Sequence, residues 1–183
     1  MLLALLAALA LPVLAPAPAA AIDASIHLER ARQAYTAGKY EDALAEYDAM
    51  LKLLGEDAAV RNNRALCYLA LSQLDRARWE SERAIELAPA EGQFYITLAV
   101  IQLTLKPADL KGARENLITS IKYLKRARDH AGVANACYNL GVIAQRRRKY
   151  EEASSWYRQA LYYDPSNMDA RDALRGIDPE SGG

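Results

Sequence analysis

Residues 137–165 read CYNLGVIAQRRRKYEEASSWYRQALYYDP, and this stretch decides the fold. Two apolar, helix-favouring segments are joined by the basic run 146–149, and a proline at position 165 closes the second segment. Small residues, Gly141 and Ala153, occur in the two segments, and the large ring of Tyr157 follows four residues after Ala153. A small residue on one helix admits a large residue of its neighbour, so this pattern predicts a pair of antiparallel helices.

The same pattern recurs along the chain. The hexapeptide GKYEDA at 38–43 closely parallels RKYEEA at 148–153, and similar frames surround Ala77 and Ala113. Upstream of these frames, Ala31, Ala65 and Ala99 lie 34 residues apart. A fixed period of this length is typical of repeat proteins, because one helix pair cannot bury its apolar face alone.

The chain resembles the tetratricopeptide repeat, whose pattern is W-x2-L-G-x2-Y, then A-x3-F, then P, over 34 residues. The last copy matches best, at Leu140-Gly141, Tyr150, Ala153, Tyr157, Ala160 and Pro165. The resemblance implies an all-α fold: an α-solenoid of about four helix-turn-helix repeats with a C-terminal capping helix. We expect the repeats at about 24–57, 58–91, 92–129 and 134–167, and the capping helix at about 167–176, with Ser166 or Asn167 as its cap.

Four tyrosines, Tyr40, Tyr47, Tyr150 and Tyr157, are predicted to be the large residues that pack on the small ones. The third copy departs from the period. We expect Pro107 in the first turn of its second helix, and we expect that helix to be longer than the others by about 9 Å at 1.5 Å per residue. Residues 130–132 are predicted to form the turn that follows it.

The first 22 residues carry no charge, and an apolar run is followed by prolines and by Ala19-Ala20-Ala21. This layout predicts a signal peptide over residues 1–21, cleaved after Ala21, and a periplasmic or secreted protein. The alternative is an inner-membrane anchor formed by the same segment, which would be the chain's sole contact with a membrane. Residues 22–177 then form the repeat domain, and residues 178–183 form a disordered tail.

Catalytic chemistry has little basis in this sequence, so we expect no catalytic residue, no metal site and no cofactor. The two histidines, His27 and His130, are a hundred residues apart, no His/Cys cluster has metal-ligand spacing, and no glycine-rich phosphate loop is present. Cys67 and Cys137 fall in different copies, too far apart for a disulfide. The 23 basic residues balance 23 acidic ones, which disfavours nucleic acid as a partner.

In the tetratricopeptide repeat family the first helices line a concave groove that takes peptides. Mapped onto this chain, the groove is lined by Arg32, Tyr35, Asn62, Asn63, Leu66, Ile96, Thr97, Val100, Asn135, Tyr138, Asn139 and Val142. Asn63 and Asn139 hold the same repeat position, where an amide can both donate and accept hydrogen bonds to a peptide backbone. Some relatives grip a chaperone's C-terminal carboxylates with a clamp of Lys, Asn and Arg. Leu28, Gln93 and Thr97 stand where this clamp requires basic residues, which disfavours that role.

These observations lead to a non-enzymatic hypothesis. We expect a protein-protein interaction adaptor or scaffold of the bacterial cell envelope, which binds a peptide or helix of a partner protein in the concave groove. The alternative is a scaffold that associates with copies of itself and forms homo-oligomers. The sequence does not identify the partner.

Overall fold

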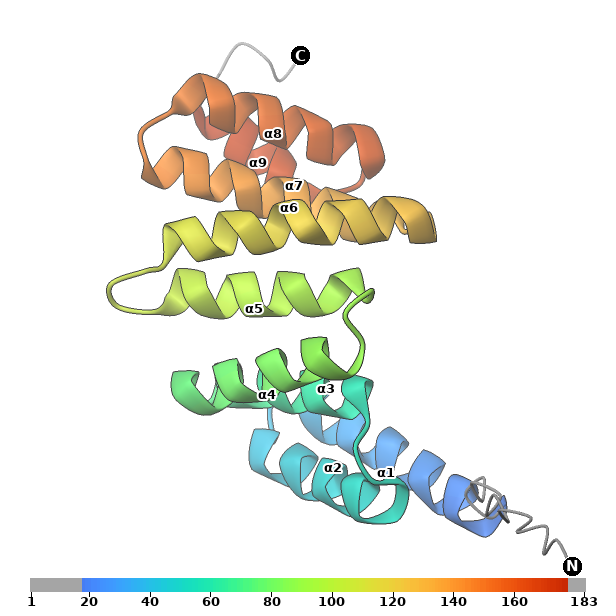
Figure 1. The fold of residues 1–183 in the computed structure, drawn as a ribbon. Helices are drawn as coiled ribbons and strands as arrows, with labels where there is room; N and C mark the ends of the chain where they lie inside the picture. Colours follow the sequence, from blue (N-terminus) through green and yellow to red (C-terminus); the bar gives the residue numbers. More distant parts are fainter. Residues whose placement is uncertain (1–17, 178–183) are drawn as a thin grey trace, which may run out of the picture.

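The computed structural model describes residues 18–177, which form an all-α solenoid (Figure 1). The described part of the chain contains no strand, so the predicted fold class is confirmed. Its helices are α1 (Pro18–Thr36), α2 (Tyr40–Leu54), α3 (Ala58–Ala70), α4 (Leu74–Leu87), α5 (Gly92–Thr104), α6 (Leu110–Ala127), α7 (His130–Arg146), α8 (Tyr150–Tyr163) and α9 (Met168–Ile177).

The helices stack in sequence order, from α1 at one end to α8 and α9 at the other (Figure 1). The most extensive contacts join α1 with α2, α3 with α4, α5 with α6, and α7 with α8, and each pair then packs on the next. In addition, α5 contacts both α3 and α7, the first helices of the neighbouring pairs. The first helices therefore form one layer of the stack, as the repeat period predicts.

The fit of rings onto small residues is closest in the last pair. Tyr157 of α8 is fully buried, and a Cβ atom added to Gly141 of α7 would lie 2.3 Å from its Cε1 atom. Tyr157 donates a hydrogen bond of 2.8 Å from its hydroxyl to Oε1 of Gln145, which fixes the ring. Tyr47 is likewise buried, but the prediction for Tyr150 is wrong: 52% of this residue is exposed, because it is the first residue of α8.

In the second pair, charged side chains form ion pairs at repeat positions where the last pair has apolar residues. Arg64 of α3 stands at the repeat position of Leu140, and it donates from Nε to Oε1 of Glu80 on α4 at 2.8 Å. Glu80 is only 2% exposed, and its Oε2 accepts from Nη1 of Arg61 at 3.0 Å. A buried carboxylate thus neutralises two guanidinium groups across this helix pair.

The third pair contains the longest second helix, as predicted. Helix α6 has 18 residues against 15, 14 and 14 for α2, α4 and α8, an excess of three to four residues, or about 5–6 Å, where about 9 Å was expected. Two local predictions are wrong. Pro107 precedes α6, because Asp109 caps that helix by accepting from the N–H of Gly112 at 2.9 Å. Residues 130–132 are the first turn of α7, because Asp129 caps it at Gly132 in the same way.

Helix α9 closes the C-terminal end of the array. Asn167 caps it by accepting from the N–H of Ala170 at 2.9 Å, so one of the two predicted caps is used. At the other end α1 begins at Pro18, and the predicted cleavage position after Ala21 falls within this helix. Most of the predicted signal segment and the predicted tail at 178–183 lie outside the described residues. No helix within 18–177 has the length and apolar character needed to cross a membrane.

We predict that Gly141→Ala destabilises the protein even though alanine is the better helix former. The new methyl group would collide with the Tyr157 ring, and overpacking of this kind costs about 1–3 kcal/mol. Thermal unfolding followed by circular dichroism should show a Tm lower by several degrees. Gly176→Ala on α9 is the matched control, because its Cβ would meet nothing within 4 Å. A Gly141→Ala protein that melts with the parent would contradict the packing described above.

We also predict that Glu80→Ala lowers the free energy of unfolding by about 3 kcal/mol, because it leaves two guanidinium groups without their buried counter-ion. The Arg64→Leu/Glu80→Leu double variant should recover most of this loss, since Leu140 already serves at the position of Arg64 in the last pair and Arg61 keeps its ion pair with Glu56. Urea unfolding monitored by circular dichroism measures the free energy of unfolding of both variants. Equal losses in the single and double variants would show that the ion pair is not the reason.

Candidate functional site

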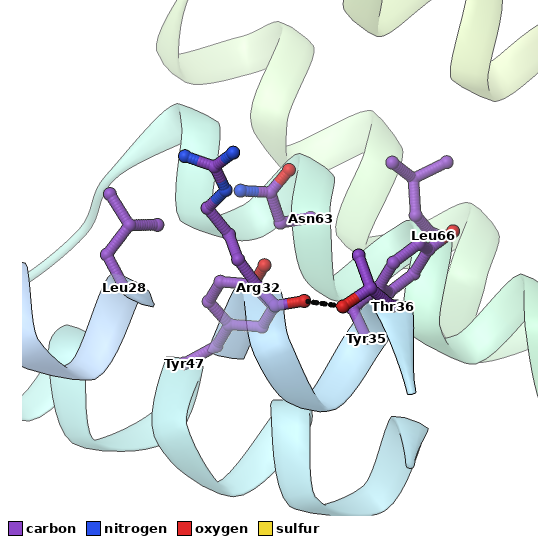
Figure 2. A pocket seen from close by; sticks show the side chains of 7 residues that line it. All are labelled: Leu28, Arg32, Tyr35, Thr36, Tyr47, Asn63 and Leu66. Atoms are coloured by element: carbon purple, nitrogen blue, oxygen red, sulfur yellow. Dashed lines mark hydrogen bonds between the residues drawn. The ribbon is translucent and has the colours of Figure 1, made fainter. Parts of the chain in front are cut away.

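An apolar pocket opens between the first two helix pairs (Figure 2). Helix α1 presents Leu28, Arg32 and Tyr35 at i, i+4 and i+7 spacing, so these side chains share one face. The pocket has a volume of about 270 Å³, below the roughly 300–1,000 Å³ of small-molecule sites. Its size therefore suits one or two side chains of a peptide. The complete lining is Leu28, Arg32, Tyr35 and Thr36 of α1, Tyr47 of α2, and Asn63 and Leu66 of α3.

Two polar groups stand beside this apolar surface. Arg32 and Asn63 come from different helices, and their polar ends point the same way, away from the Tyr47 ring (Figure 2). Neither side chain forms a hydrogen bond or ion pair with another side chain among residues 18–177, whereas the Thr36 hydroxyl donates to the Arg32 carbonyl at 3.0 Å. The guanidinium and the amide are therefore available to a bound chain.

The pocket tyrosines are neutral at physiological pH. Burial, with smaller contributions from nearby Cys67 and Tyr35, raises the pKa of Tyr47 to about 12, and the positive charge of Arg32 partly offsets this rise. Burial also raises the pKa of Tyr35. Because a raised pKa favours the protonated phenol, neither ring carries a charge that would repel an acidic ligand.

Four of the predicted groove residues, Arg32, Tyr35, Asn63 and Leu66, meet in this pocket. The structure places two others inside the protein. Asn62 is 8% exposed, and Thr97 is 6% exposed with its hydroxyl donating to the Gln93 carbonyl at 3.4 Å. Ile96 is partly buried against the core of the third and fourth pairs, and Val100 is half-buried on α5.

The remaining predicted residues lie on α7, where α9 changes their surroundings. Tyr138 packs on the Tyr157 ring with centroids 5.8 Å apart, and Asp169 of α9 adds to the effect of burial in raising its pKa. Val142 packs against the cluster that contains Leu174 of α9. Asn135 is exposed and Asn139 is half-buried, and the Asn139 amide donates to the Asn135 carbonyl at 2.9 Å. One of the two amide N–H groups of Asn139 is therefore bonded to its own helix, whereas the Asn63 amide has no side-chain partner among residues 18–177.

Three residues of the pocket, Leu28, Thr36 and Tyr47, are not among the twelve predicted groove residues. The repeat pattern assigns Tyr47 to the core, and the residue is indeed only 3% exposed. Part of its ring still reaches the pocket, beside Arg32 and Asn63. Thr36 could have been found from the spacing on α1, where it follows Arg32 at i+4 as Leu28 precedes it at i−4.

Reactive groups in the described residues are held in structural contacts. Nδ1 of His27 lies 2.5 Å from Oε2 of Glu46, a pairing of α1 with α2 at the repeat position of Arg61 and Glu80. Cys67 and Cys137 are free and buried, and burial raises the pKa of each thiol to about 11, so neither is a thiolate at neutral pH. No group of three or more His, Cys, Asp or Glu side chains within 18–177 is arranged to hold a metal ion.

Comparison with known proteins agrees with this architecture. Residues 134–167 match the family model of the tetratricopeptide repeat. The chain is 33% identical over 78 residues to sperm-associated antigen 1 of Homo sapiens, covering 43% of this chain and 8% of that protein. It is 22% identical over 147 residues to the Hsp70-Hsp90 organizing protein of Triticum aestivum, covering 80% of this chain and 18% of that protein.

Among solved structures, a thermophilic TPR protein of Thermus thermophilus superimposes with a TM-score of 0.73 at 20% identity, covering 87% of this chain and 83% of that one. At this identity the likeness establishes the fold. The chain spans less than a fifth of the curated relatives named above. The family model thus covers one repeat of the array, and the solved structure shares its fold. Tetratricopeptide repeat proteins are generally protein-interaction adaptors.

Proposed function

We propose that this protein is a non-enzymatic adaptor that holds a peptide segment of a partner protein in the groove lined by its first helices. The observation that carries the proposal is the pocket between α1 and α3, where an apolar lining lies beside an available guanidinium and an available amide. An apolar surface with a few convergent polar groups is the usual composition of a binding site.

Each part of the pocket has a role in this proposal. Leu28, Tyr35 and Leu66 receive an apolar side chain of the peptide, which is the anchor. The Asn63 amide donates to and accepts from the peptide backbone, and Arg32 pairs with a carboxylate beside the anchor. The preferred ligand is therefore an extended segment with an apolar residue next to an acidic one.

A chaperone-type carboxylate clamp is not part of this proposal. Leu28 lines the pocket with an apolar side chain, and Gln93 uses its Nε2 to donate to Oδ2 of Asp129 at 2.7 Å. Thr97, the third position that the clamp would need, is buried. None of these positions offers a cation to a bound carboxylate.

The proposal places the adaptor in the bacterial cell envelope. It is supported by the uncharged residues 1–22, with their apolar run and their small residues before Asp23. Export with cleavage after Ala21 would leave Ile22 as the first residue, within α1, and the mass of the chain recovered from the periplasm tests this assignment.

Self-association is the second candidate function, and the open end of the array favours it. Ile22 and Ile26 on α1 are 61% and 44% exposed and lie at i, i+4 spacing on one face. No earlier helix among the described residues covers them. Two copies could bury these faces against each other in a symmetric contact.

We predict that Leu66→Asp and Asn63→Ala each weaken partner binding at least fivefold, because the first places a charge in the apolar pocket and the second removes the backbone-binding amide. The measurement is capture of envelope proteins on the mature chain, followed by titration of the recovered partner against each variant. Asn139→Ala is the matched control, since Asn139 occupies the same repeat position but lies outside the pocket, with one amide N–H bonded to the Asn135 carbonyl. If both pocket variants bind the partner as tightly as the parent does, the partner does not bind in this groove.

For the second candidate, we predict that Ile22→Asp/Ile26→Asp shifts any dimer to monomer without lowering Tm, because both side chains are exposed in the single chain. Light scattering coupled to size-exclusion chromatography measures the mass of parent and variant. A parent chain that is monomeric at all concentrations tested eliminates self-association, and a variant that stays dimeric eliminates this face as the contact.

A further inference from the structure

Charge is unevenly distributed along this electrically neutral chain. Residues 92–149 contain eleven basic and three acidic side chains, a net charge of +8. Residues 1–91 contain nine basic and thirteen acidic side chains, a net charge of −4. The excess positive charge thus belongs to the third helix pair and the start of the fourth, away from the pocket at α1 and α3.

Much of this charge is aligned on one face of α6. Four exposed cations flank an exposed Ile118 at intervals of three, four, four and three residues, which keeps them on a single helix face. This face, the α6 stripe, consists of Lys111, Arg114, Ile118, Lys122 and Lys125. It lies opposite the buried residues Ala113, Leu117 and Leu124, and its length is about 21 Å at 1.5 Å per residue.

Both ends of the α6 stripe are bordered by further groups. At the start of α6, a pocket of about 400 Å³ is lined by Lys111, Arg114, Arg147 and Lys149 together with Glu115 and Glu152, and Lys149 pairs with Glu152 at 3.4 Å. At the other end, the Lys125 ammonium lies 5.4 Å from the centroid of the Tyr163 ring. The neighbouring Tyr162 is 80% exposed, so an aromatic ring is available where the cations end.

Within the part of the chain that the structure describes, the cations of the α6 stripe have no ion-pair partner. Arg61, Arg64 and Arg83, in the first half of the array, all pair with Glu56 or Glu80. No ion pair within residues 18–177 involves any cation of the α6 stripe. Like charges at i, i+3 or i, i+4, such as Lys122 and Lys125, each cost a helix about 0.2–0.5 kcal/mol. An external anionic ligand would turn this repulsion into attraction.

We propose that the α6 stripe is a second binding surface, which takes an acidic helical segment of a partner protein. Carboxylates spaced along one face of that segment would pair with the four cations, and an apolar residue at its centre would pack on Ile118. This site is separate from the proposed groove, so each surface can be tested while the other is intact.

Other anionic partners fit the surface less well. Nucleic acid would place its phosphates near Glu115 and Glu152, which border the cationic pocket, and Tyr95 and Tyr123 are stacked on each other with centroids 5.7 Å apart. A membrane surface requires a broad apolar face of large residues, and the α6 stripe exposes one apolar side chain. A single row of cations around one apolar residue matches an amphipathic helix.

The test uses a fluorescein-labelled helical peptide of about 15 residues, long enough to span the α6 stripe. Glutamates occupy one face, with a leucine at the centre. Fluorescence anisotropy with the mature chain should show saturable binding that weakens as salt rises from about 50 mM to about 500 mM. The same peptide with glutamine in place of glutamate should not bind.

Substitutions on and away from the α6 stripe test whether the peptide binds there. Lys122→Glu/Lys125→Glu should weaken binding at least tenfold. Arg30→Glu/Lys52→Glu, which changes the net charge equally on exposed residues of the first pair, should alter binding less than twofold. Ile118→Ala should weaken binding of the leucine peptide but leave unchanged the binding of a peptide with alanine at that position. Leu66→Asp in the groove should have no effect, which separates failure of this inference from failure of the proposed function.

Several outcomes would overturn the inference. Equal weakening by both double variants would mean that binding follows net charge and has no site on α6. If Ile118→Ala weakens binding of the leucine peptide and the alanine peptide equally, the peptide helix does not lie across the α6 stripe. Stronger binding of single-stranded RNA or of phosphatidylglycerol vesicles, abolished by Lys122→Glu/Lys125→Glu, would assign the surface to that class of partner instead.

Discussion

The close approach of paired helices is the constraint on which the rest of this structure depends. At Gly141 the α7 backbone comes so near to α8 that the Tyr157 ring occupies the space of a Cβ atom. The repeat positions of Tyr157 in the other pairs hold Tyr47, Ser81 and Leu117, all of which are buried. The same geometry is therefore satisfied by different side chains, and the pair with the small Ser81 also contains the buried Glu80 and its two arginines. The distance between the paired helices is the feature that recurs, and each repeat fills the space between them with different side chains.

The period of 34 residues was enough to predict the fold, because small residues at equivalent repeat positions indicate which helix faces pack against each other. Helix ends were predicted less well. Asp109 and Asp129 each stand three residues before a glycine and accept its N–H, and these two caps place the starts of α6 and α7. The capping signal D-x-x-G is visible twice in the sequence, but the nearby Pro107 and Gly132 suggested other boundaries. Capping side chains, rather than the breakers beside them, determine where these helices begin.

The predicted groove shows what periodicity alone cannot resolve. Asn63 and Asn139 hold equivalent positions, yet the Asn139 amide bonds to its own helix while the Asn63 amide has no side-chain partner within residues 18–177. Equivalent positions also differ because the ends of the array are not alike. Helix α9 packs beside Tyr138 and Val142, whereas part of Tyr47 in the first pair is open to a pocket. A repeat sequence thus predicts the faces of its helices, and the ends of the array decide which positions on them stay accessible.

The distribution of charge divides the array into two functional halves. Near α3 and α4, arginines and glutamates neutralise one another, so this region is stabilised internally, and the neighbouring pocket is lined mainly by apolar side chains. On α6 the cations are exposed and have no counter-ions among the described residues. Only anions from solution or from a partner can therefore neutralise this surface. Apolar pockets give affinity that persists in salt, while an unpaired charged face gives faster and salt-sensitive association. An array with both kinds of surface can capture one segment loosely on α6 and raise the effective concentration of a second segment at the pocket. Two modest sites on one rigid stack would then act as a single stronger one, which is the physical basis on which a small repeat protein can serve as an adaptor.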